Sequence, residues 1–79
     1  MISVIIPALN EEDNIRNCVE GVLNEGCDCE IIIAEGGSRD KTAEFAKMYP
    51  GVSFIQSRKG RGIQMNMGAS TAAGDILIL

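Results

Sequence analysis

Three basic side chains and one acidic side chain stand out as groups that can bind a phosphorylated ligand. Arg58, Lys59 and Arg61 fall within four positions of a chain whose formal net charge is -4. Glu35 follows an apolar segment and is itself followed by two glycines. A carboxylate can accept hydrogen bonds from a base or a ribose, arginine binds phosphate, and glycine lets a ligand approach the backbone closely. These residue types favour a nucleotide pocket, although three clustered basic residues are also common on a solvated surface.

The elements that must position these groups follow from the spacing of apolar and turn residues. Short apolar runs predict four strands, at residues 2–6, 31–34, 52–55 and 76–79. Helical spacing and end signals predict helices between them, from Asn10 to Gly26, from about Asp40 to Pro50, and over residues 63–73 closed by Gly74. This alternation predicts an α/β fold with a Rossmann-like doubly wound parallel sheet and helices on both faces.

Polar residues and glycines gather in three loops that follow the first three strands, at residues 7–12, 35–40 and 57–64. In open α/β sheets ligands bind outside the carboxyl ends of the strands. We therefore expect the loops to surround a nucleotide, with Glu35 on one side and Arg61 on the other. Simpler interpretations stay open: Asn10 and Ser38 can be helix caps, the glycines a tight turn, and Glu35 a solvated acid at the sheet edge.

Two familiar nucleotide motifs are excluded. The pattern GxxxxGK[ST] is absent, so the chain has no P-loop. Gly60 and Gly62 follow a strand and open a helix, but a dinucleotide fingerprint needs glycine three positions later, where this chain has Met65. The acidic net charge also argues against a nucleic acid partner.

The three cysteines fit neither a disulfide framework nor a usual zinc site, because their number is odd and the chain has no histidine. We infer no metal from them and expect a reducing cytoplasm. Cys18 lies on the apolar face of its predicted helix, whereas Cys27 and Cys29 flank a turn and can be reactive.

The length of 79 residues permits one small domain. The first apolar run is broken at Pro7 and is too short for a signal peptide or a membrane span. Residues 76–79 read Ile-Leu-Ile-Leu, which is typical of a central strand, yet the chain ends there. We expect truncation, or cover of this strand by another copy of the chain.

Three segments, SVIIPALNEEDNI, IIIAEGGSRDKT and GRGIQMNMGASTAAGDILIL, resemble successive blocks of family 2 glycosyltransferases with the GT-A fold. The resemblance covers the whole chain and keeps the family's order and spacing. It implies inverting transfer of a sugar from a nucleotide-diphosphate donor, of the UDP, GDP or dTDP type, to a sugar, lipid or protein acceptor.

The resemblance also implies which positions bind the nucleotide. The positions of the first loop that lie against the nucleoside are Pro7, Ala8, Asn10 and Glu12. Glu35 accepts from the base, and Gly37, Ser38 and Asp40 match the Gly-Ser of the family's Asp-Asp-Gly-Ser turn and the acid after it. Arg61 and Gln64 fall in the loop that approaches base and diphosphate. Asn66 matches an asparagine of the following helix. The chain departs from this turn, since Glu35 replaces its first Asp and Gly36 its second, which leaves the base open.

The family's Asp-x-Asp motif, which holds Mg²⁺ or Mn²⁺ against the donor diphosphate, and its acidic general base have no counterpart in these residues. Asp75 cannot replace them, because it begins its strand at the opposite edge. Residues 1–79 are thus expected to form a partial nucleotide-sugar-binding domain, truncated before the Asp-x-Asp motif, with no catalytic residue, no cofactor and no activity alone.

Two alternatives stay open beside this hypothesis. One is a small interaction domain that self-assembles, or pairs with a separately encoded second half, through its last strand. The other is an unrelated nucleotide-binding α/β protein. The expected location is the cytoplasm, with the membrane surface open for a full-length family member.

Overall fold

The computed structural model describes residues 1–79, which form four strands and three helices in strict alternation. In chain order they are β1 Ile2–Ala8, α1 Ile15–Asn24, β2 Cys29–Glu35, α2 Thr42–Ala46, β3 Ser53–Gln56, α3 Arg61–Ser70 and β4 Asp75–Ile78. All strand pairs are parallel, and the sheet order is β3-β2-β1-β4. The predicted Rossmann-like doubly wound sheet is confirmed.

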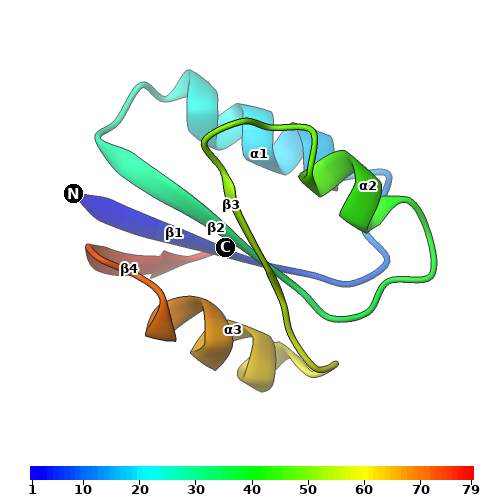
Figure 1. The fold of residues 1–79 in the computed structure, drawn as a ribbon. Coiled ribbons are helices and arrows are strands. Elements are labelled where there is room, and N and C mark those ends of the chain that lie inside the picture. The colour runs from blue at the N-terminus through cyan, green and yellow to red at the C-terminus, as the bar shows by residue number, and fades with distance from the viewer.

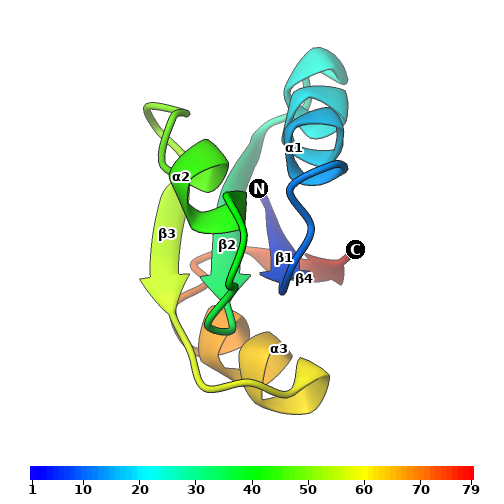
Figure 2. The same cartoon turned by 90° about the vertical axis from the view of Figure 1, so that its right-hand side faces the viewer.

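The helices cover both faces of the sheet. Figure 1 shows α1 and α2 on one side and α3 on the other, and the turned view in Figure 2 shows the sheet between these two layers. After β3 the chain crosses to the far side of β1, so the strand order reverses between β1 and β4. This reversal places the switch point of the fold at the carboxyl ends of β1 and β4.

The two central strands carry the core because both of their faces are covered. Their β-branched residues, such as Ile5 and Ile33, are fully buried, as parallel strands between two helical layers require. On the α1 and α2 face a single apolar cluster fills the space between helices and sheet: Val4, Ile6, Ala8, Ile15, Val19, Ile31, Ile33 and Ala46.

Helix α3 lies unusually close to the sheet. A Cβ atom added at Gly68 would lie 2.5 Å from Cγ2 of Ile5, so only glycine fits between α3 and β1. The small residues of α3, which the sequence shows as Gly and Ala at several positions, therefore permit the contact that fixes the start of this helix near the carboxyl ends of the strands.

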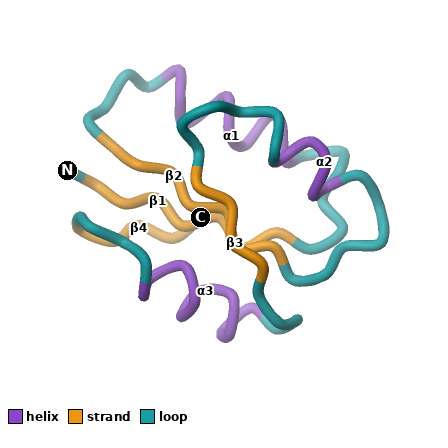
Figure 3. Tube along the Cα trace, viewed as in Figure 1, coloured by secondary structure: helices purple, strands orange, loops and turns teal.

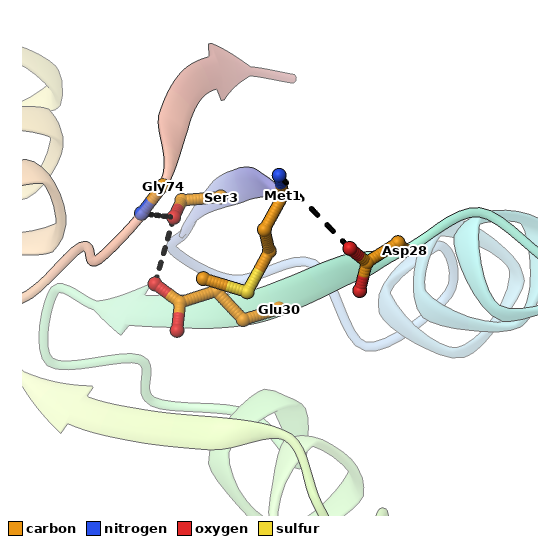
Figure 4. A network of polar contacts seen from close by, with 5 residues as sticks. All are labelled: Met1, Ser3, Asp28, Glu30 and Gly74. Carbon is orange, nitrogen blue, oxygen red and sulfur yellow. Dashed lines mark hydrogen bonds and ion pairs between the residues drawn. The ribbon is translucent and has the colours of Figure 1, made fainter.

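A hydrogen-bonded network joins three strands at the opposite, amino edge of the sheet (Figure 4). The buried Ser3 hydroxyl donates to Oε1 of Glu30 at 2.7 Å and accepts from the Gly74 N–H at 2.8 Å. The same Glu30 oxygen accepts from the Ala73 N–H at 2.8 Å. The network ties the start of β4 to β1 and β2, and Asp75 begins β4 at this edge, as expected.

The helix boundaries differ from the predicted ones, while every strand agrees within two residues. Asn10 does not begin α1, which starts at Ile15, and the three acids 11–13 precede its first turn. Helix α2 has five residues and starts at Thr42, so Ser38 is not its cap. Helix α3 begins at Arg61 and ends at Ser70, before the predicted Gly74.

Candidate functional site

The loops that follow β1, β2 and β3 meet at the carboxyl edge of the sheet, as the parallel order requires. The segments after β1 and β2 run side by side at that edge, and the segment after β3 leads into α3 beneath them (Figure 3). Two cavities, of about 290 and 180 Å³, open at the switch point and share Pro7, Glu11 and Arg61 in their walls. The larger one is also lined by Leu9, Lys59, Gly60 and Gln64.

A larger groove of about 460 Å³ lies between α1 and β4, but its walls are mainly apolar. It includes residues such as Ile2, Val22 and Leu77 and carries few groups that can orient a polar ligand. The cavities at the switch point, which combine cations with the ends of parallel strands, are therefore the stronger candidate for a site.

Glu35 is the last residue of β2, and its carboxylate accepts hydrogen bonds from the backbone of the loop that follows. Only 2% of the residue is exposed, and its carboxylate accepts from the Gly37 N–H at 2.9 Å, the Ser38 N–H at 2.6 Å and Nε2 of Gln56 at 3.1 Å. Burial raises the pKa of this carboxyl, but hydrogen bonds from Ser38, Gly37 and Gln56 outweigh burial and lower it. Glu35 is thus an ionised acid that shapes the turn, and it is not solvated at the edge.

Asn10 and Ser38 bond the first two loops to each other instead of capping helices. The Asn10 N–H donates to the Ser38 hydroxyl, and the Arg39 N–H donates to Oδ1 of Asn10, both at 2.9 Å. Asn10 has a φ of 53° and is the only residue other than glycine with a positive φ. Asparagine tolerates this left-handed conformation better than most residues.

A second set of bonds joins the same loops one turn further on. The Glu11 N–H donates to Oγ1 of Thr42 at 2.7 Å, and the Glu12 N–H donates to Oδ2 of Asp40 at 3.2 Å. The Lys41 N–H donates in turn to Oε2 of Glu12 at 3.4 Å. The Thr42 hydroxyl, which donates to Asp40, is the largest cause of the lowered pKa of that carboxyl. We call the bonds between residues 10–12 and 38–42 the loop latch.

The basic cluster supplies the positive charge of the site. Arg58, Lys59 and Arg61 are exposed, and Lys59 and Arg61 line the larger cavity. Nη2 of Arg61 donates to the Leu79 carbonyl at 3.2 Å, which holds the guanidinium beside the end of β4. The only ion pair of the chain joins the amino terminus to Asp28, at 4.0 Å, so these three cations have no acidic partner.

The remaining residues expected in the site lie in different environments, in a cavity wall, in the core or on the surface. Pro7 lines both cavities, whereas the side chain of Ala8 is fully buried in the core. Gln64 is 3% exposed, and its Nε2 donates to the carbonyls at the ends of β1 and β2. Asn66 is exposed on α3 and lines neither cavity. No group of three or more His, Cys, Asp or Glu side chains is arranged to hold a metal ion.

Two residues that stabilise the site, Gln56 and Thr42, were not expected from the sequence, although a sequence pattern indicates each of them. Gln56 lies opposite Glu35 in the register of β2 and β3, which an alignment of the predicted strands would have paired. Thr42 follows Asp40 by two positions, the spacing at which an acid accepts from a nearby N–H in a turn, here at 2.9 Å. Both hold the polar groups that were expected to bind ligand.

Comparisons with known proteins agree with this architecture. The model of glycosyl transferase family 2 matches residues 3–79. An uncharacterized glycosyltransferase of Escherichia coli, YibD, is 37% identical over 92% of this chain and 23% of its own length. The dolichyl-phosphate β-glucosyltransferase ALG5A of Trichomonas vaginalis is 27% identical over 99% of this chain and 29% of its own length.

Solved structures share the fold over the whole chain. Glucosyl-3-phosphoglycerate synthase from Mycobacterium tuberculosis, in complex with Mn²⁺, UDP and glucosyl-3-phosphoglycerate, superposes with a TM-score of 0.84 and 26% identity over 100% of this chain and 32% of that one. The mannosyltransferase PcManGT from Pyrobaculum calidifontis, with GDP-Man and Mn²⁺, has a TM-score of 0.71 and 21% identity over 92% of this chain and 24% of that one, a likeness of fold.

The parallel sheet and its loop-lined carboxyl edge define an α/β protein of the GT-A type. The chain belongs to glycosyltransferase family 2. This membership excludes the alternative of an unrelated nucleotide-binding α/β protein. The chain spans about a quarter of the length of these curated relatives. None of its helices has the length and apolar character that crossing a bilayer requires.

Proposed function

We propose that this chain is the donor-binding part of an inverting family 2 glycosyltransferase and that it binds nucleotide-diphosphate sugars of the UDP, GDP or dTDP type. The observation that carries the proposal is the cavity of about 290 Å³ at the switch point, where Lys59 and Arg61 have no acidic partner. A relative of the same fold at 26% identity holds UDP and Mn²⁺, which supports a nucleoside diphosphate as the ligand.

In this proposal the site residues divide into those that face the ligand and those that hold the loops. Lys59 and Arg61 bind the diphosphate, because both line the cavity and carry free positive charge. The segment at Pro7 and Ala8 lies against the nucleoside. Glu35 serves the base indirectly, because its carboxylate is 2% exposed and accepts from the N–H groups of Gly37 and Ser38, which fixes the turn beside the site.

Asn10, Glu12, Gly37 and Ser38 serve the nucleotide through the loops that they form. Their side chains or N–H groups take part in the loop latch or in the turn that Glu35 closes. Rigid loops place ligand-binding groups before the ligand arrives, so less entropy is lost on binding. We therefore assign the latch a role in preorganisation.

The reaction of such an enzyme is attack of an acceptor hydroxyl on the anomeric carbon, with loss of the nucleoside diphosphate and transfer of the hydroxyl proton to a base. The residues of this chain would bind and orient the donor for that attack. We assign none of them to the Mg²⁺ or Mn²⁺ site that the family implies, since no group of three or more His, Cys, Asp or Glu side chains lies together. We expect nucleotide binding by this chain and no sugar transfer by it alone.

A titration followed by NMR tests the proposal. UDP, GDP and dTDP should shift the amide signals of residues 35–38 and 59–61, and the Arg61→Ala variant should bind roughly tenfold more weakly, as loss of a charge-assisted hydrogen bond predicts. Arg58→Ala is the matched control, since Arg58 is exposed in the same loop but lines neither cavity. No response to millimolar UDP or GDP would remove the proposal.

A further inference from the structure

The carboxamide of Gln64 joins the ends of β1 and β2 to the loop before α3. Its Nε2 donates to the carbonyl of Ala8, the last residue of β1, and to that of Ala34 near the end of β2, each at 3.0 Å. Its Oε1 accepts from the Gly60 N–H at 3.3 Å, just before α3 begins. One buried side chain thus fixes the relative positions of the first strand, the second strand and the third helix.

The chemistry of this arrangement selects glutamine. Both amide hydrogens of Gln64 point to carbonyl oxygens, and its own oxygen faces a donor, so every polar atom is satisfied. A carboxylate of the same shape would place an oxygen against the oxygens of Ala8 and Ala34, with no hydrogen between them. An apolar side chain would leave these buried carbonyls with fewer partners.

Gly36 is matched to Gln64. A Cβ atom at position 36 would lie 2.8 Å from Cδ of Gln64 and 2.9 Å from its Nε2 and Oε1, closer than such atoms approach in real contacts. Gly36 is buried and its N–H donates to the Ala8 carbonyl at 2.9 Å, so the backbone cannot easily retreat. The missing side chain at position 36 therefore makes room for the carboxamide.

We propose that Gln64 is a positioning residue of the nucleotide site, and that Gly36 and Gln64 act as a pair that sets where Lys59 and Arg61 stand relative to the Pro7 loop. Arg61 lies three residues before Gln64 on the first turn of α3, so the anchor at Gln64 fixes the base of the guanidinium. Gln64 does not bind the nucleotide through its amide, since both amide hydrogens are occupied. This inference rests on the proposed function.

The variant Gln64→Glu tests the hydrogen-bond directions with almost no change of shape. The introduced carboxyl would be buried against two carbonyl oxygens, which raises its pKa. When it is ionised it has no donor for either carbonyl, and when it is protonated it regains one donor. The charged groups that surround the position are Glu35 at the end of β2, Glu11 after β1, Lys59 before α3 and Arg61 on it. The two acids raise the pKa of the introduced carboxyl further, and the two cations lower it.

The measurement is the Kd for UDP of the variant divided by that of the wild-type chain, from pH 5.5 to 8. We expect a ratio of about ten at pH 8 that falls to about three or less at pH 5.5. Asn24→Asp is the control, because it makes the same change of charge at the exposed end of α1. A ratio near one over the whole pH range overturns the positioning role.

A double-mutant cycle tests the pairing and does not depend on Gln64→Glu being well folded. Gly36→Ala should weaken UDP binding by forcing the carboxamide aside, whereas Gly36→Ala with Gln64→Ala should show about threefold less loss than the two separate effects combined. Additive losses would contradict the pairing.

The same contact predicts that relatives with an acidic residue in place of Gly36 lack glutamine in place of Gln64, and an alignment in which both commonly occur together would also contradict it.

The ligand-free chain separates this inference from the proposed function. In Gln64→Glu, the amide signals of Gly36 and Gly60 should move with pH between 5.5 and 8 well beyond their movement in the wild-type chain. If wild type fails to bind UDP while these signals move, the proposed function fails and Gln64 still positions the loops. If the Gly36 and Gly60 signals of the variant match those of the wild-type chain throughout this range, the positioning role fails whether or not UDP binds.

Discussion

Asn10 and Ser38 bond across 28 positions of sequence, at 2.9 Å, and hold Asn10 in a left-handed conformation at the edge of the candidate site. We predict that Asn10→Ala destabilises the chain by about 2 kcal/mol, because alanine is strained at this φ and loses the acceptor for the Arg39 N–H. Asn10→Gly should cost less, since glycine removes the strain. Urea unfolding measures both, and equal losses would show that backbone strain contributes nothing.

The acid sensitivity of the chain should depend on Glu30 at the opposite edge (Figure 4). The Ala73 N–H is the largest cause of the lowered pKa of this carboxyl, and the Ser3 hydroxyl is the next. A lowered pKa in the folded state means that Glu30 stabilises the fold above the ordinary glutamate pKa of about 4.3 and that this stability is lost as the pH falls through the folded value. We predict that Glu30→Gln shows a smaller drop in its urea midpoint between pH 7 and pH 3 than wild type.

The control for this prediction is Glu25→Gln, at an exposed position just after α1. This variant should keep the full drop of the wild-type chain. If Glu30→Gln and wild type lose the same midpoint between the two pH values, the network at the amino edge does not contribute to acid sensitivity.

The strands and the loop positions could be predicted from the sequence, because they depend on local patterns. Continuous β-branched runs such as residues 31–33 specify buried parallel strands, and parallel strands bring their following loops to one edge. The roles of Asn10 and Ser38 could not be predicted in this way. An Asn or Ser that caps a helix cannot be distinguished in sequence from one that bonds to another loop. The partners of Asn10 here, Ser38 and Arg39, lie 28 and 29 residues away.

The role of Gln64 also could not be predicted from local sequence. Its place in the loop before the third helix suggested contact with the ligand, but its polar atoms meet backbone groups 56 and 30 residues away. Only the closeness of α3 to the sheet, which depends on the whole topology, brings them together. The sequence therefore located the candidate site and left open which polar groups hold it together.

The turn after β2 should depend on the charge of Glu35. Its ionised carboxylate accepts from two N–H groups and from Gln56, so Glu35→Gln would turn an amide donor toward existing donors. We predict a loss of about 2 kcal/mol in the free energy of unfolding, as for a buried hydrogen bond to a charged group. Because the folded pKa is lowered, the wild-type turn should persist unchanged from pH 8 to pH 5, and NMR signals of Gly37 and Ser38 that titrate in this range would contradict it.

The close contact between α3 and β1 predicts a specific pattern of damage and rescue. Gly68→Ala would place a methyl group 2.5 Å from Cγ2 of Ile5, and overpacking of this kind costs about 1–3 kcal/mol. Because α3 carries both Arg61 and Gln64, the displaced helix should also weaken UDP binding. Ile5→Leu removes the branch at Cβ while it keeps the volume, so the double variant should recover part of both losses.

Two quantities test this prediction in the wild type, the two single variants and the double variant: the free energy of unfolding and the Kd for UDP. Recovery of both by Ile5→Leu would show that the distance between α3 and the sheet controls the site as well as the fold. Recovery of stability without recovery of binding would show that the placement of Arg61 does not depend on this contact, and the link from the packing of Gly68 to the cavity would then be wrong.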